Sequence, residues 1–311
     1  MIDMAQKTEV KAKEIEKLAK DLDIAIAVFQ KICLSIQDKC LRNGVTEIED
    51  LPDEFFPLEG ITSAMKRMRG LSESNLLLMS DLELSAAIRF VFEMSLWVSF
   101  LAGPIENGKR YFAISVLENQ RYLKKEIKYM EYEVANMRAA DALKDTSLRE
   151  LAEKGVMTGR TGVFEEEIKK IWLDNEVIAA KTFSIYSDWV KGGNFGTIAD
   201  YIETKALPDL NHLLTSVDAR LLSLKNSGVN VSRIKTETLA EMAGMVPEYE
   251  WIFSYTSRKI HAEPFSISGD FSVLTNHEKF IYVQYFLRKV NEILATSYEV
   301  FKRRKEFPNR F

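Results

Sequence analysis

Two opposite charges, Arg89 and Glu93, lie inside a very apolar stretch of the chain. The segment from 86 to 102 reads AAIRFVFEMSLWVSFLA and is otherwise built of aliphatic, aromatic and small residues. A helix that is apolar on every side is normally buried, and a buried ion is usually paired or used, because its uncompensated burial is costly. A spacing of four residues lets the two side chains meet on one helical face. We therefore expect an ion pair, either within the structural core or in a functional site.

His261 is the histidine whose neighbours are best suited to chemistry. Tyr249, Phe253, Ser257 and His261 recur every four residues and so follow one face of a short helix, with Arg258 also within reach of the imidazole. In the last turn of a helix the dipole favours the imidazolium, which suits His261 for acid–base catalysis. The alternative is a histidine with a purely structural role.

The sequence lacks the motifs of metal and phosphate sites. It contains no HExxH, no Glu-x-x-His pairs and no cluster of aspartates, so we expect neither a catalytic metal nor another cofactor. The glycines of GVMTGRTG (155–162) lack the Gly-Lys-Ser/Thr of a Walker loop, and we interpret them as an interhelical loop. Ser257 and His261 on one helix do not form a nucleophile elbow, which argues against a serine hydrolase.

The composition is that of an ordinary soluble protein. With 311 residues and a net charge of −4, the chain has no global field that would attract nucleic acid or anionic lipid. Cys33 and Cys40 are seven residues apart in one helical pattern, too far for a disulfide, and we expect them to be reduced. A polar N-terminus without a signal-peptide core then predicts a cytoplasmic protein. Charges within the 86–102 helix argue against a membrane span.

Helical periodicity dominates the chain and predicts an all-α fold of long antiparallel helices. We predict an N-terminal amphipathic helix and loop at 1–60 and a helical bundle at 61–311, or one continuous domain. The expected helices cover 5–41, a hydrophobic stretch from Ser72 or Ser74 to 103, 109–154 with a break near 145–146, 164–190, 198–204, 207–225, 236–243, 247 to about 261, and 275–305. Asn43-Gly44 is the expected stop of the first helix, and Thr275 with Glu278 three residues later is the expected capping box of the last. A loop containing Pro52 and Pro57 follows the first helix, and only 229–231 and 271–273 look like strands.

The chain resembles a family of uncharacterised prokaryotic all-helical proteins. The resemblance rests on Arg89-x3-Glu93 in an apolar helix and on Ser257-x3-His261 in an aromatic-rich helix before a proline. It covers roughly residues 70–300. Tyr249 and Phe253 match aromatic positions of that family.

More distantly, the pattern is similar to the HEPN superfamily of helical nucleotide-binding and ribonuclease domains, and this similarity implies an HEPN-like core. HEPN ribonucleases place an arginine and a histidine four to six residues apart on one helix and cleave RNA without a metal. Here only two residues separate Arg258 from His261. The resemblance therefore implies that Arg89, on another helix, supplies the cation.

Two functions follow as hypotheses. In the first, the chain is a metal-independent ribonuclease or a protein that binds RNA or a nucleotide. His261 is then the acid–base group, Arg89 and Arg258 stabilise phosphate charge, Glu93 orients Arg89, and Ser257 donates a hydrogen bond. In the second, it is a non-enzymatic interaction protein that forms a homodimer through its long helices, and the Arg89–Glu93 pair is structural. Neither hypothesis involves a membrane.

Overall fold

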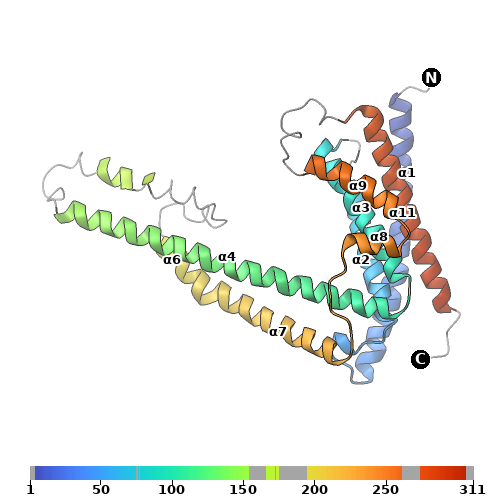
Figure 1. Ribbon diagram of the computed structural model, residues 1–311, viewed down its shortest axis with the longest axis horizontal. Helices are drawn as coiled ribbons and strands as arrows, with labels where there is room; N and C mark the ends of the chain where they lie inside the picture. Colours follow the sequence, from blue (N-terminus) through green and yellow to red (C-terminus); the bar gives the residue numbers. More distant parts are fainter. Residues whose placement is uncertain are drawn as a thin grey trace. The chain divides into compact units, whose positions relative to one another are not determined.

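The chain is all-α, as the periodicity predicts (Figure 1). The computed structural model describes residues 4–74, 76, 78–153, 166–171, 173–174, 195–260 and 274–305. Within these residues every regular element is helical. The elements are α1 (Met4–Arg42), η1 (Ile48–Asp50), α2 (Phe55–Glu73), α3 (Asp81–Leu101), α4 (Glu106–Glu153), α6 (Phe195–Tyr201), η4 (Ile202–Ala206), α7 (Leu207–Asn226), α8 (Thr236–Met242), α9 (Val246–Ile260) and α11 (Asn276–Lys305). The strand-like segment 229–231 is not a strand, and 271–273 lies outside the described residues.

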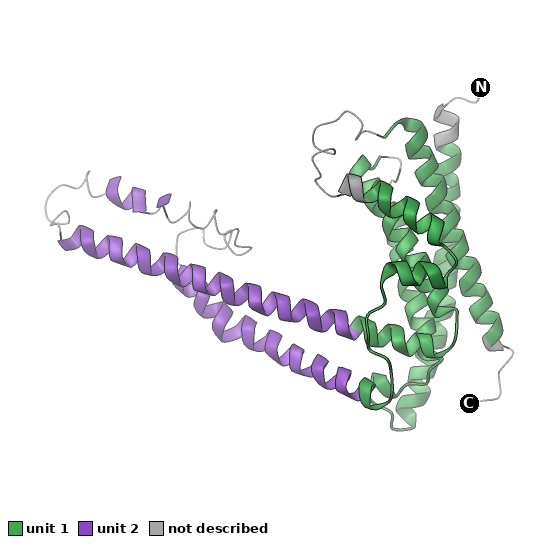
Figure 2. Cartoon of the chain, viewed as in Figure 1, with its two compact units in different colours: residues 1–115, 224–311 green, residues 116–223 purple. Residues whose placement is uncertain are grey.

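The chain divides into two compact units (Figure 2). Unit 1 comprises residues 1–115 and 224–311, and unit 2 comprises residues 116–223. The long helix α4 contributes its beginning to unit 1 and the remainder to unit 2. The predicted boundary at residue 60 stays a prediction, while α1 itself packs against α2 within unit 1.

Helix α3 is the centre of unit 1. It packs against α2, α8, α9 and α11, and Ile88, Phe92 and Leu96 are completely buried. In the described part of the chain, α3 is the one helix long and apolar enough to cross a bilayer, and most of its apolar window is buried in unit 1. The centre of a helical bundle requires such a sequence because the helix meets neighbours on several sides.

Several helix ends follow from local sequence. Helix α1 ends at Arg42, and Gly44 then adopts a φ of 81°, a left-handed conformation that favours glycine. Thr275 and Glu278 form the predicted capping box of α11: the Thr275 N–H lies 2.7 Å from Glu278 Oε2, and the Glu278 N–H lies 3.2 Å from Thr275 Oγ1. Both predictions are confirmed.

Three predicted boundaries are wrong. The cap of α3 is Ser80, which forms a capping box with Glu83, and neither Ser72 nor Ser74 has that role. The predicted loop around Pro57 is instead the first turn of α2, where proline is tolerated because a first-turn N–H has no intrahelical partner. Helix α4 continues without a break through residues 145–146.

Unit 2 is built around the pairing of α4 with α6, η4 and α7. Met130, Val134, Met137 and Ala140 of α4 form a small apolar core with residues of α6 and η4. Arg138 of α4 forms ion pairs with Asp200 and Glu203. Most of the helix predicted at 164–190 lies outside the described residues.

Candidate functional site

The predicted pairing of Arg89 with Glu93 is present on α3. Arg89 Nε donates a hydrogen bond to Glu93 Oε1 at 3.1 Å, as the four-residue spacing requires. The two side chains are 26% and 32% exposed, so the pair lies at the edge of the core and meets solvent. At that exposure an ion pair adds little to stability, and its geometry is more informative than its energy.

An aromatic residue of helix α9, Phe253, also contacts Arg89. The Phe253 ring lies under the Arg89 guanidinium, with 4.1 Å between the guanidinium carbon and the ring centroid. This is a cation–π contact. Tyr249 packs on Phe253 with a centroid separation of 4.4 Å, and both rings pack against the apolar core of unit 1, so the predicted aromatic face of α9 faces that core. Glu93 binds the Nε edge of the guanidinium and Phe253 covers one of its faces, so the two residues together restrict its movement.

The remaining predicted site residues cannot be placed beside Arg89. Ser257 and Arg258 belong to the helical backbone of α9, but their side chains lie outside the described part of the structure, and His261 lies outside it entirely. The helix continues through Ile260. Ser257 therefore follows Phe253 by one turn on the same face of α9. Their convergence with Arg89 and Glu93 stays a prediction.

An aromatic and acidic cluster joins α9 to α11, and the sequence analysis did not anticipate it. Trp251 stacks on Tyr255 at 5.9 Å between centroids, and Tyr255 meets Tyr282 edge-on at 5.9 Å. The Tyr255 hydroxyl donates to Glu278 Oε1 at 3.1 Å. Glu278 thus caps α11 through Oε2 and links α9 to α11 through the hydrogen bond that Oε1 accepts. The capping box was visible in the sequence, whereas the tyrosine contact arises only from packing.

Lys289 is a second feature that sequence reasoning missed. Its side chain is only 2% exposed, and its ammonium lies 2.9 Å from Glu248 Oε2 and 2.7 Å from Glu292 Oε2. Glu292 is the neighbour three residues along α11, whereas Glu248 comes from α9. A buried ammonium requires such carboxylates because its desolvation is costly. The arrangement joins the two helices.

Burial changes the ionisation of two tyrosines on α11. Burial raises the pKa of Tyr282, and the neighbouring Tyr255 raises it further. Burial is also the main cause of the raised pKa of Tyr285, with the nearby Glu248 carboxylate as the next cause. Both phenols therefore stay neutral in the folded protein over the range in which free tyrosine ionises.

Unit 1 is expected to lose stability at alkaline pH for this reason. Because the unfolded chain releases these protons first, stability is complete below about pH 10 and falls above it by about 1.4 kcal/mol per pH unit for each such tyrosine. Urea unfolding at about pH 9 and about pH 11, followed by circular dichroism, measures the loss. Tyr282→Phe should retain more stability at the higher pH, and Tyr298→Phe, on an exposed position of α11, should not. Equal losses in both variants would contradict the assignment.

The described residues include two further histidines and both cysteines. His212 and His277 are exposed. Among the described residues, no group of three or more histidines, cysteines or carboxylates is arranged to hold a metal ion. Neither Cys33 nor Cys40 is part of a disulfide.

Comparison of the chain with protein-family models, with curated proteins and with solved structures finds no match in any of the three.

Proposed function

We propose that this chain is an HEPN-like helical protein that acts on RNA or a nucleotide without a metal ion and operates in the cytoplasm. In this proposal Arg89 binds a phosphate group and His261 transfers protons. Glu93 orients Arg89, Ser257 donates a hydrogen bond to the substrate, and Arg258 adds positive charge.

The observation that supports this proposal is the restrained and partly exposed side chain of Arg89. Glu93 binds its Nε edge and Phe253 covers one face, while the side chain is still 26% exposed. A guanidinium carries five N–H donors in a planar fork that matches phosphate oxygens. A cation already held in place loses little freedom when an anion binds, and such preorganised charge is what stabilises a transition state.

The reaction that these groups suit is cleavage of RNA through its own 2′-hydroxyl. His261 removes the hydroxyl proton, the 2′-oxygen forms a bond to the adjacent phosphorus, and the bond from phosphorus to the 5′-oxygen breaks. His261 then returns the proton to that leaving oxygen, so the step releases no net proton. The products are a 2′,3′-cyclic phosphate and a free 5′-hydroxyl. Arg89 stabilises the negative charge that accumulates on the phosphate oxygens in the transition state.

The test is cleavage of a short single-stranded RNA by the full chain in the presence of EDTA. His261→Ala should reduce the rate by roughly 100-fold or more, the usual contribution of a general acid or base. Arg89→Lys keeps the charge and loses the planar fork, and it should also be slow. His277→Ala removes an exposed histidine elsewhere and is the matched control. Wild-type cleavage by folded His261→Ala would overturn the assignment.

A second function is an interaction protein without catalysis. The described part of unit 2 favours it, because its long helices α4 and α7 carry large exposed side chains, among them Tyr122, Tyr132 and Leu222. In this case the Arg89–Glu93 pair serves packing alone. Because the pair is partly exposed, Glu93→Gln should then change the melting temperature only slightly, and no RNA cleavage should be detected. A normal melting temperature together with lost RNA cleavage would instead favour the catalytic role.

A further inference from the structure

The outer face of α1 is exposed and carries large apolar side chains. Leu22, Ile26 and Phe29 on the opposite side of the helix are buried in the core of unit 1. On the outer face, Leu34 is 58% exposed and Leu41 is 57% exposed. Two exposed leucines two turns apart do not by themselves mark a contact surface, because single exposed apolar side chains are common.

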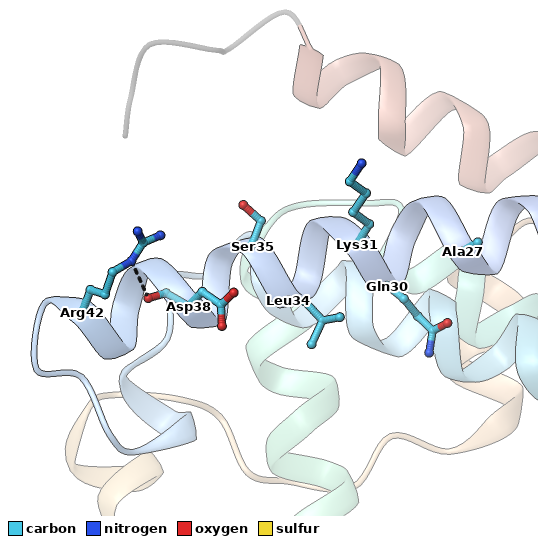
Figure 3. A pocket seen from close by; sticks show the side chains of 7 residues that line it. All are labelled: Ala27, Gln30, Lys31, Leu34, Ser35, Asp38 and Arg42. Carbon is cyan, nitrogen blue, oxygen red and sulfur yellow. Dashed lines mark hydrogen bonds between the residues drawn. The ribbon is translucent and has the colours of Figure 1, made fainter.

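Two opposite charges lie within this apolar face. Lys31 and Asp38 are exposed, and neither has an ion-pair partner among the described residues. Because they are seven residues apart, roughly 10 Å along the helix, they cannot pair with each other. They belong to a shallow, open hollow whose described lining lies entirely on α1 (Figure 3). Figure 3 shows Lys31 and Leu34 pointing to opposite sides of this face.

The pattern is complementary to itself under a two-fold rotation. An axis perpendicular to α1 that passes beside Leu34 brings a second copy of the helix into antiparallel contact. It sets Leu34 against Leu34 of the second copy and Ala27 against Leu41 of the second copy. The same axis sets Lys31 opposite Gln37 of the second copy, one residue (about 1.5 Å along the helix) from Asp38, and the long lysine side chain can span that offset. Because the contact is isologous, this ion pair forms twice.

We propose that the α1 face formed by Ala27, Lys31, Leu34, Asp38 and Leu41 is the interface of a homodimer of this chain. A second copy is the occupant that the charges select, because the two-fold rotation brings each of these charges within one residue of its opposite on the second copy. A lipid surface would leave Asp38 unpaired against anionic headgroups. This inference is independent of the proposed activity on RNA.

Exchange of the two charges tests the interface through the mass of the full chain in sedimentation equilibrium. Wild type is expected to be a dimer. Lys31→Asp places like charges in contact twice, as does Asp38→Lys, and each should raise the dissociation constant about tenfold or more. An equimolar mixture of the two variants should form a heterodimer, in which both contacts are again between opposite charges. Its affinity should return to that of wild type.

The mixture also keeps the test informative if one variant is weakly folded, because recovery requires both partners to be native. Lys66→Asp reverses an exposed charge on α2 and should leave the dissociation constant unchanged. The two interface variants shift net charge in opposite directions, so net repulsion cannot explain both losses. A monomeric wild type, a dimer insensitive to either reversal, an equal loss in Lys66→Asp, or a mixture that stays dissociated would each overturn the proposal.

Discussion

Gly108→Ala is expected to destabilise unit 1 by roughly 3 kcal/mol, because the new methyl group has no room. Gly108 is buried near the start of α4, where it meets the first turn of α2. A Cβ at this position would lie 2.5 Å from Pro57 Cγ and 2.7 Å from the Pro57 backbone nitrogen. The pyrrolidine ring is fixed to the backbone and cannot rotate away. Relief would therefore require α2 and α4 to move apart.

Gly70→Ala is the matched control for this substitution. Gly70 also lies in a helix, α2, but a Cβ there would meet no atom within 4 Å. Since alanine favours the helical backbone more than glycine does, this variant should be more stable by about 0.5–1 kcal/mol. Urea unfolding monitored by circular dichroism gives both values. A Gly108→Ala variant that unfolds at the wild-type urea concentration would show that the contact between Gly108 and Pro57 does not constrain the packing.

Removing both carboxylates from Lys289 is the second change with a large expected effect. In Glu248→Gln/Glu292→Gln the ammonium remains buried and loses its two ion pairs, at 2.9 and 2.7 Å in the structure. An uncompensated buried charge typically costs 3–5 kcal/mol, so the double variant should lose about that much stability. Adding Lys289→Met should restore most of it, because methionine has a similar length and carries no charge.

A variant of the exposed Arg288 is the control that distinguishes the effect of burial on stability from the effect of charge pairing. Arg288 contacts the same two carboxylates, at 3.2 Å from Glu248 and 3.6 Å from Glu292, but its side chain is 60% exposed. Water can replace those contacts, so Arg288→Gln should change the free energy of unfolding by less than about 1 kcal/mol. Thermal unfolding of the three variants and of wild type provides the comparison. Failure of Lys289→Met to rescue the double variant would show that the carboxylates stabilise the fold by another route.

Helix content and several helix ends could be predicted from the sequence because their causes are local. The apolar periodicity of α1 and α11, the glycine at position 44, and the Thr275–Glu278 capping box each depend on residues within a turn or two of one another. The i,i+4 pairing of Arg89 with Glu93 is of the same kind, and the structure contains it. The one long helix that was overlooked, α2, was obscured by Pro57, which its first turn tolerates.

Only the tertiary structure decided what surrounds these local features. Phe253 lies under Arg89, and Glu248 reaches Lys289, because helices distant in sequence bury their apolar faces against one another. Packing also decided that the Arg89–Glu93 pair lies at the edge of the core, and that α1 presents its leucines and unpaired charges outward. Local hydrogen bonding and periodicity determine that a segment is helical. Which face meets which neighbour is determined by the burial of the whole apolar surface, which no single window of sequence contains.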